Sequence, residues 1–418
     1  MLQIDHVYEF FYRHILKDIT VYTLPNGVYR LDDISFDDVY VFNFDNNNQK
    51  ILFLDQEPII NKLSIPYINV FEYCNPNTHT LETMIELRKT NSLKYNMFNR
   101  PPGDLQSPAT QKRLRDSIKT PVAMVISEYS TLSKELAKTY NIEILYYFFH
   151  GFAASDWFRS FQVLNYNKQI IKKYQYDFVS FNRIISDDRS YRCLFISKLV
   201  EHNLLDKGRL SFGLDTTKTW EQEITSADTK LSTSAIQHIQ TYLPEIKQSL
   251  IIDKEHVNGY DSSDIPRIID DCFWHVVTET VFYYDKLHLT EKIFKPIVMK
   301  QPFMLIGAVG NLEYLRSYGF KTFDGIIDES YDNIIDPDQR IDAVVTQLKW
   351  YCGLSDNEKL DIMKAVEPIV EYNFNHFYND FRSIITNELL NNCQELFKKI
   401  GYDDSTIAYN DIYKTLVN

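Results

Sequence analysis

The sequence predicts an α/β protein with two sheet domains in tandem and a helical tail. Short β-rich runs alternate with helical patterns along most of the chain, and the 418 residues are enough for two or three domains. The part after Pro337 has an almost wholly helical pattern. We expect domains at residues 1–168, 169–336 and 337–418, and a linker at residues 166–175, where the chain is polar and carries lysines.

The composition is that of a densely packed globular protein. Hydrophobic residues make up 44% and charged residues 24%, with only 12 glycines and 14 prolines, which excludes a disordered chain. The formal charge of −13 argues against a protein whose whole surface coats nucleic acid. Five scattered cysteines without a CxxC pair indicate buried thiols in a reducing compartment. Because no apolar run approaches ~20 residues and the N-terminus lacks a signal-peptide pattern, we expect a cytoplasmic protein without a membrane span.

The first half predicts one strand–helix–strand unit and an additional strand pair. Residues 39–42 and 51–54 are aromatic and branched enough for strands, with a turn at 45–48 between them. Residues 122–126 predict a buried strand, then a helix capped by Ser127, and residues 142–149 predict the returning strand. Such a unit favours a parallel sheet with helices on its faces.

The second half predicts a second set of such units. The expected elements are strands at 178–181, 272–277 and 303–306, helices at 189–203 and 312–318, and a short helix opened by Thr290. Gly319 ends the helix at 312–318 in the position after its cap. Residues 206–260 show no clear pattern and are expected to form helices and loops.

The stretch at residues 274–323 carries the strongest chemical signal. Glu279 follows a predicted strand, and Thr290 can cap a helix whose first turn holds Glu291 and Lys292. The free N–H groups and partial positive charge of a helix N-terminus suit a phosphate. A lysine adds charge for a diphosphate, and a carboxylate accepts sugar hydroxyls. The alternative is an ordinary capped helix, with Glu291 complementing the helix dipole and Lys292 in solvent.

This pattern resembles the donor-binding motif of the α-1,3-fucosyltransferases. The resemblance lies in the Thr-Glu-Lys helix start, then Pro302-Phe303 and a hydrophobic strand ending in Gly307. In that family an acidic residue about a dozen positions upstream lines the donor site, and Glu279 has that position. Residues 178–213 resemble the family's strand–Asn–Arg–helix segment, in which an arginine holds the diphosphate of the sugar nucleotide.

The resemblance covers residues 178–325 and implies a set of donor-site residues. Arg192 is the best match to the diphosphate-binding arginine, and its neighbours Arg183 and Arg189 could substitute for it. The implied donor-binding residues are Asn182, Arg183, Arg189, Arg192, Glu279, Tyr284, Thr290, Glu291 and Lys292. With its Lys295-Pro296 step, the pattern is still more similar to uncharacterised glycosyltransferases of bacteriophages and large viruses. The fucosyltransferases usually have a small or aromatic residue in place of Pro296, so the donor sugar is not carried over.

The resemblance implies a glycosyltransferase of GT-B architecture, with two Rossmann-like domains facing a cleft and a helical extension. Its donor would be a nucleotide-diphospho-sugar, namely a UDP- or GDP-sugar. It would act as a hexosyl- or pentosyltransferase on a hydroxyl acceptor. If the protein is viral, it would act in the host cytoplasm. Arginine, lysine and a helix N-terminus would stabilise the departing diphosphate. Many transferases instead hold a metal with Asp-x-Asp, but Asp336-Pro337-Asp338 is typical of a turn and cap, so we expect no metal.

The candidates for the catalytic base lie in the N-terminal domain. Asp55 and Glu57 come directly after the strand at 51–54, and the carboxyl ends of parallel strands are where such sheets bind ligands. The alternative is a polar turn before a proline. His150 follows the strand at 142–149 and is the rival base. We favour Glu57 as the base, with His150 contacting donor or acceptor.

A basic segment bears on the acceptor. Residues 88–119 contain eight basic and two acidic residues, with Tyr95 and Phe98 between them. Such a segment could grip a phosphate backbone and stack bases, or it could be a solvated helix face and a flexible lid. The acceptor is therefore a glycan, a small molecule or a flipped, hydroxymethylated base of phage DNA. A further alternative is a non-catalytic interaction module that keeps the sugar-nucleotide fold.

Overall fold

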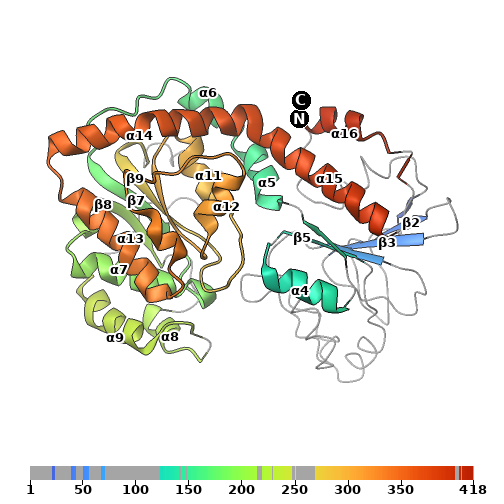
Figure 1. Cartoon of the computed structure of the whole chain (residues 1–418). Coiled ribbons are helices and arrows are strands. Elements are labelled where there is room, and N and C mark those ends of the chain that lie inside the picture. The colour runs from blue at the N-terminus through green and yellow to red at the C-terminus, as the bar shows by residue number, and fades with distance from the viewer. Residues whose placement is uncertain are drawn as a thin grey trace. The chain divides into compact units, whose positions relative to one another are not determined.

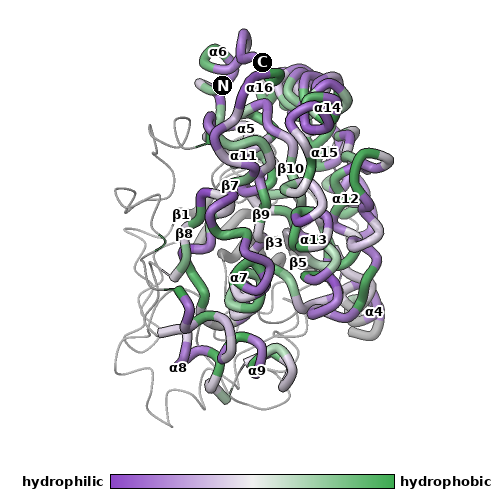
Figure 2. The backbone as a smooth tube through the Cα atoms, turned by 90° about the vertical axis from the view of Figure 1, so that its left-hand side faces the viewer, coloured by the Kyte–Doolittle hydropathy of each residue, from purple (hydrophilic) through white to green (hydrophobic). Residues whose placement is uncertain are grey.

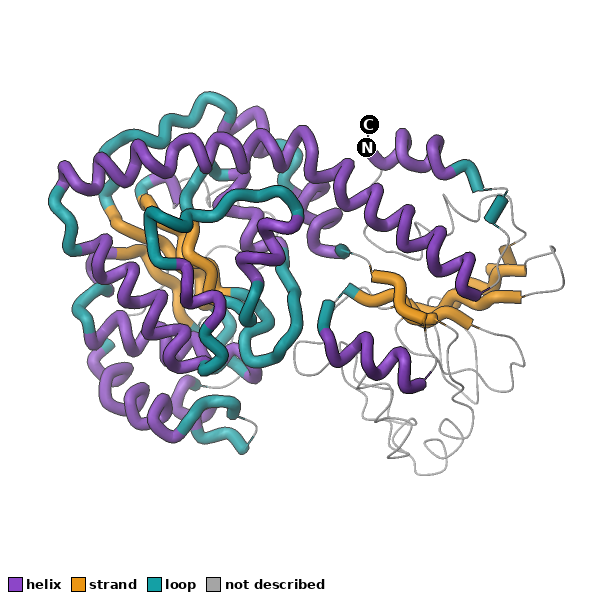
Figure 3. Tube along the Cα trace, viewed as in Figure 1, coloured by secondary structure: helices purple, strands orange, loops and turns teal. Residues whose placement is uncertain are grey.

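The chain divides into two compact units, each with its own β-sheet (Figure 1, Figure 3). Unit 1 comprises residues 1–153 and 383–418, and unit 2 comprises residues 154–382. The computed structural model describes residues 21–23, 39–43, 50–55, 67–70, 123–127, 129–140, 143–146, 148–213, 219–227, 229–246, 250, 269–400, 404–405 and 407–417. The α/β fold class is confirmed.

Unit 1 contains a six-stranded mixed sheet with the strand order β1-β2-β3-β4-β5-β6. Its strands are β1 (Val21–Thr23), β2 (Val39–Asn43), β3 (Lys50–Asp55), β4 (Tyr67–Val70), β5 (Ala123–Ile126) and β6 (Glu143–Tyr146). Strands β1, β2 and β3 pair antiparallel, whereas β3 to β6 run parallel. Helix α4 (Thr131–Tyr140) connects β5 to β6, so the predicted strand–helix–strand unit is confirmed.

The predicted strand at 142–149 is too long, because its second half is helical. Strand β6 ends at Tyr146, and helix α5 (Phe149–Trp157) begins three residues later. Phe149, Phe152 and Ala153 are all buried. Ala154 and Asp156 are buried as well, so α5 is enclosed on nearly all sides.

Unit 2 contains a four-stranded parallel sheet with the strand order β10-β9-β7-β8. Strands β7 (Tyr176–Asn182), β9 (Cys272–Thr278) and β10 (Phe303–Ile306) agree with the sequence prediction. Strand β8 (Gly208–Phe212) lies in the segment without a clear pattern. Gly208 is required there, since a Cβ atom would come within 2.4 Å of the Phe178 ring on β7. The arrangement is compatible with a Rossmann-like fold.

Several helices lie wholly within unit 2. They are α6 (Phe161–Asn165), α7 (Tyr191–Glu201), α8 (Trp220–Ile224), α9 (Thr233–Tyr242), α11 (Glu291–Val298), α12 (Asn311–Ser317), α13 (Pro337–Cys352) and α14 (Asp356–His376). The 3₁₀ turns are η4 (Asp187–Arg189), η5 (Leu205–Lys207), η6 (Leu243–Glu245) and η7 (Glu329–Asn333). Helix α7 packs against α9 and α13, while α11 packs against β9, β10 and α14 (Figure 1).

The core of unit 2 is rich in aromatic side chains. All seven residues of β9 are buried, and Trp274 at its centre has no exposed surface. The Trp274 ring meets the rings of Phe323 and Tyr351 edge to face, with centroids 5.4 and 5.9 Å apart. Such pairs add about 0.5–1.5 kcal/mol each beyond the area they bury, so the aromatic-rich composition serves this core.

The two units divide the chain at other points than the sequence suggested. The expected linker at 166–175 belongs to unit 2, where Ile170 is buried and the Lys168 ammonium donates to the Met299 carbonyl over 2.8 Å. The expected helical extension at 337–418 is divided between the two units. Helices α13 and α14 belong to unit 2. Helix α15 (Arg382–Ile400) lies almost wholly in unit 1, and α16 (Tyr409–Val417) lies wholly in unit 1. A π-helical turn, η8 (Phe377–Phe381), connects α14 to α15 without a break.

No helix within the described ranges is long and apolar enough to cross a membrane.

Candidate functional site

The carboxyl ends of β7 and β9 form the candidate site in unit 2. Along the chain, β7 is followed by β8, which pairs with one side of β7, and then by β9, which pairs with the other side. The direction in which strands are added to the sheet therefore reverses between β7 and β9. Open α/β sheets bind ligands outside the carboxyl ends of strands at such a reversal. Asn182 ends β7, and Glu279 directly follows β9. Two predicted site residues therefore lie at the edge where this fold binds ligands.

Helix α11 begins at this edge with the predicted cap. The Thr290 hydroxyl accepts a hydrogen bond from the Lys292 N–H over 3.3 Å and donates to Glu279 Oε2 over 2.6 Å. The Thr290 N–H donates to Glu279 Oε1 over 3.1 Å, and the Thr280 N–H donates to Glu279 Oε2 over 3.2 Å. Glu279 thus holds the first turn of α11 against the end of β9.

Glu279 is completely buried, and its role is positional in this structure. Burial raises the pKa of its carboxyl, while the charge of Lys292 and the hydrogen bonds from Thr290 act in the opposite direction. Its three donors satisfy the carboxylate without leaving a free face. Glu279 therefore fits the role of orienting Thr290 better than that of contacting a sugar.

Lys292 places a cation beside the helix N-terminus. Its ammonium donates to Thr280 Oγ1 and Thr290 Oγ1, both over 3.2 Å, and to Glu291 Oε1 over 3.0 Å. The Lys292 side chain is 30% exposed and that of Glu291 is 18% exposed. Because two of its bonds go to neutral hydroxyls, an incoming phosphate could replace Glu291 at the ammonium.

Arg192 differs most from its predicted role. It is only 3% exposed, and its guanidinium donates to the Ile184 carbonyl over 2.7 Å and to the Thr278 carbonyl over 2.8 Å. It thereby ties the chain after β7 to the end of β9. Among the described residues, no carboxylate forms a salt bridge with it, and its Nε has no hydrogen-bond partner. In this structure Arg192 therefore holds two backbone carbonyls beside the candidate site.

The other predicted residues of unit 2 surround the same edge. Asn182 is fully buried, and its Nδ2 donates to Ser180 Oγ over 3.0 Å, while its Oδ1 has no described partner. Arg183 and Arg189 are half-buried and so are more accessible than Arg192. The half-buried Tyr284 ring lies 5.3 Å from the Lys286 ammonium.

Two positioning residues carried no sequence signal. The Tyr191 hydroxyl donates to the Glu279 carbonyl over 2.5 Å, and its ring stacks on Phe282 with centroids 4.1 Å apart. The Asn311 side chain accepts from the His288 N–H over 3.3 Å and donates to its carbonyl over 3.4 Å. These contacts span residues far apart in the chain, so no local pattern could indicate them.

The Asp336-Pro337-Asp338 motif is a helix cap, as predicted. Asp336 Oδ1 accepts from the Gln339 N–H over 2.9 Å, and Pro337 is the first residue of α13. In the described ranges, no three His, Cys, Asp or Glu side chains gather where they could bind a metal.

Of the three predicted catalytic residues in unit 1, Asp55 and His150 lie within the described residues and Glu57 does not. Glu57 and the basic segment 88–119 are among those not described. Asp55 is the last residue of β3, and β3 pairs parallel with β4. Asp55 therefore lies at the carboxyl end of a parallel strand, as predicted. His150 does not follow a strand but is the second residue of α5, where it is half-buried.

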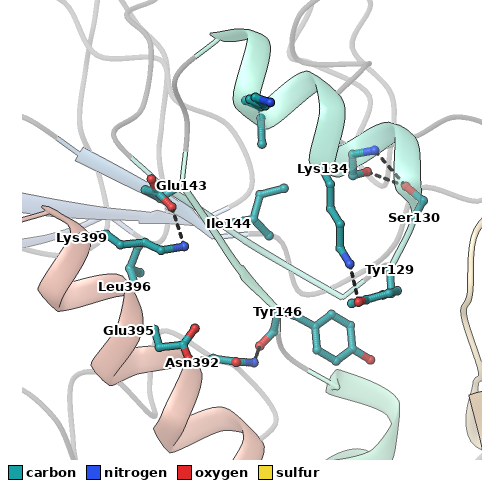
Figure 4. A pocket seen from close by; sticks show the side chains of 13 residues that line it. Tyr129, Ser130, Lys134, Glu143, Ile144, Tyr146, Asn392, Glu395, Leu396 and Lys399 are labelled. Carbon is teal, nitrogen blue, oxygen red and sulfur yellow. Dashed lines mark hydrogen bonds and ion pairs between the residues drawn. The ribbon is translucent and has the colours of Figure 1, made fainter. Parts of the chain in front are cut away.

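Unit 1 also contains a cavity that no predicted site residue lines (Figure 4). It has a volume of about 480 Å³ and lies between α4, β6 and α15. Lys399 pairs with Glu143 over 3.1 Å at one end, and Asn392 Nδ2 donates to the Tyr146 carbonyl over 3.0 Å at the other. Its size suits a small molecule, but its charged lining includes both signs and indicates no particular ligand.

A Ser–His–Glu cluster in unit 2 is structural. His238 Nδ1 lies 3.1 Å from Ser197 Oγ, and its Nε2 lies 3.0 Å from Glu201 Oε2. Ser197 is fully buried, and its hydroxyl donates to the Leu194 carbonyl over 2.7 Å. Because Ser197 is fully buried, no substrate can reach its hydroxyl. The cluster ties α9 to α7.

No protein-family model matches this chain, and no curated protein matches it.

Proposed function

We propose that this chain is a glycosyltransferase of the GT-B type that takes a sugar from a nucleotide-diphospho-sugar. The observation that supports it best is the position of Lys292 at the N-terminus of α11, beside the end of β9. A partly exposed ammonium and the positive end of the α11 helix dipole suit a diphosphate. The presence of an α/β sheet in each unit is compatible with the GT-B architecture.

In this proposal the chain acts mainly on the leaving group. As the bond from the sugar to the diphosphate breaks, negative charge grows on the phosphate oxygens. Lys292 and the α11 N-terminus would stabilise that charge more strongly in the transition state than in the ground state. Arg192 would add to the positive potential without contacting the ligand, and Glu279 would hold Thr290 so that the first turn of α11 stays in place. The donor would be a UDP- or GDP-sugar.

The acceptor in this proposal is a hydroxyl group. A glycan, a small molecule and a hydroxymethylated base of DNA all offer one, and Asp55, Glu57 and His150 stay the candidate residues for removing its proton. Transfer of a radiolabelled sugar to each acceptor class distinguishes among them.

The experiment that tests the donor site is a thermal-shift screen of the full chain against UDP-, GDP- and CMP-sugars, with hydrolysis of each hit monitored. A ligand at 100 times its Kd stabilises the folded chain by about 2.7 kcal/mol. The control variant is Lys364→Ala, at an exposed lysine on α14. We expect one nucleotide class to raise the Tm of the wild type and of Lys364→Ala, but not the Tm of Lys292→Ala. An equal shift in all three proteins would reject the proposed site, and the lack of any shift would reject the proposed function.

A further inference from the structure

Helix α6 exposes apolar side chains to an extent found in few other places on unit 2. Val163 is 83% exposed, Leu164 67% and Tyr166 65%, and we call these three side chains the α6 surface. Single exposed apolar residues are common, whereas adjacent ones indicate a binding surface. In Figure 2 hydrophobic and hydrophilic stretches of the tube lie side by side at α6.

The α6 surface is held firmly by buried contacts beneath it. Asn165, between the exposed residues, is buried, and its Nδ2 donates to the Val298 carbonyl over 3.0 Å. The Lys300 ammonium donates to the Tyr166 carbonyl over 2.7 Å. These bonds hold the C-terminal end of α6, at Asn165 and Tyr166, to Val298 and Lys300 at and just after the end of α11.

Basic groups outnumber acidic groups around the α6 surface. From residue 158 to residue 176 the chain contains four basic residues and no acidic ones. Three carboxylates lie near these basic groups, and each forms an ion pair. Asp156 pairs with Arg159 and Arg382. Asp270 pairs with Lys168 and Lys172, and Glu371 pairs with Lys300. Lys173 is exposed as well. The surroundings are therefore cationic in a protein of net charge −13.

We infer that the α6 surface docks on an anionic phospholipid bilayer. Three side chains are far too few for a stable protein interface, which needs about 20–30 residues on each side. Interfacial binding to a membrane needs only a few inserted apolar side chains together with cations near the lipid headgroups. Tyrosine suits this boundary because its ring is apolar and its hydroxyl is polar. This inference does not depend on the proposed function.

The test is co-sedimentation of the full chain with vesicles of phosphatidylcholine alone and of phosphatidylcholine with phosphatidylglycerol. We expect binding to the anionic vesicles that salt weakens, and a loss of at least about tenfold in the Val163→Ser/Leu164→Ser double variant. Ile335→Ser is the matched control, since Ile335 is 84% exposed on the same unit but lies in an acidic stretch of the chain, with Asp336 and Asp338 next to it. Lys173→Glu is expected to weaken binding to the anionic vesicles alone.

Equal vesicle binding by the double variant and the wild type would overturn the inference, and so would the lack of wild-type binding. Sedimentation velocity adds a second readout without lipid. If the wild type self-associates and the double variant does not, the surface joins copies of the chain and the lipid assignment is rejected. Because the substituted side chains are highly exposed, we expect the Tm of every variant to stay near that of the wild type.

Discussion

The Thr290 hydroxyl is the best place to test how the candidate site is built. It donates to Glu279 and accepts from both the N–H and the ammonium of Lys292. Thr290→Val keeps the shape and removes all three bonds. Losing the cap costs about 1 kcal/mol, and losing a buried hydrogen bond to a charged group costs about 1.5–3 kcal/mol. We expect unit 2 to lose about 2.5–4 kcal/mol of stability.

Urea denaturation followed by tryptophan fluorescence measures this loss directly. All four tryptophans of the chain lie in residues 154–382, so their fluorescence reports the unfolding of unit 2. With an m-value of about 3 kcal/mol per M, the midpoint should fall by about 1 M. Thr290→Ser keeps the hydroxyl and should cost well under half as much. If Thr290→Val and Thr290→Ser have the same midpoint, the hydrogen bonds do not hold the helix start and the reasoning fails.

Three further predictions concern the same unit. Lys292→Ala should lower nucleotide-sugar turnover by about 100-fold or more, which steady-state kinetics on a hit from the donor screen can check; turnover within a few-fold of wild type would contradict it. Arg192→Ala should destabilise unit 2 by about 3 kcal/mol because it leaves two buried carbonyls unpaired, and an unchanged urea midpoint would show that those bonds do not matter. Burial lowers the pKa of His275 from 6.5 to about 3, so the folded chain keeps it neutral while the unfolded chain takes up a proton below pH 6.5. Stability should therefore fall as the pH falls from 6.5 towards 3, by about 2 kcal/mol at pH 5. The difference in unfolding free energy between the wild type and His275→Asn should shrink by the same amount over this pH range. If that difference does not depend on pH, His275 is not the cause.

The sequence predicted the features that depend on neighbours in the chain. The cap by Thr290, the strands β7, β9 and β10, and the end of α12 at Gly319 all follow from local patterns, and all are present. Strand β8 was missed because only two of its five residues are buried and its fit depends on Gly208 approaching Phe178. A strand at the edge of a sheet carries a weaker hydrophobic pattern than one inside it.

The roles of individual site residues were harder to predict than the elements that carry them. The sequence placed Arg192 correctly at the start of α7, but its partners are the carbonyls of Ile184 and Thr278, and the second of these is 86 residues away. Likewise, the run of aromatic residues before His150 suits a strand as well as a helix. Only the burial of Phe152 and Ala153 against the rest of the fold selects the helix.

The division of the chain also determines the order in which a ribosome can complete its parts. Residues 154–382 form a continuous insertion in unit 1, and residues 383–418 of unit 1 are made only after the whole insertion. The sheet of unit 1 emerges early but lacks Asn392 and Lys399, the partners of β6, until then. The inserted unit can therefore reach its native state while the outer one is still open, and a stop codon between residues 383 and 418 would leave the outer unit unfinished.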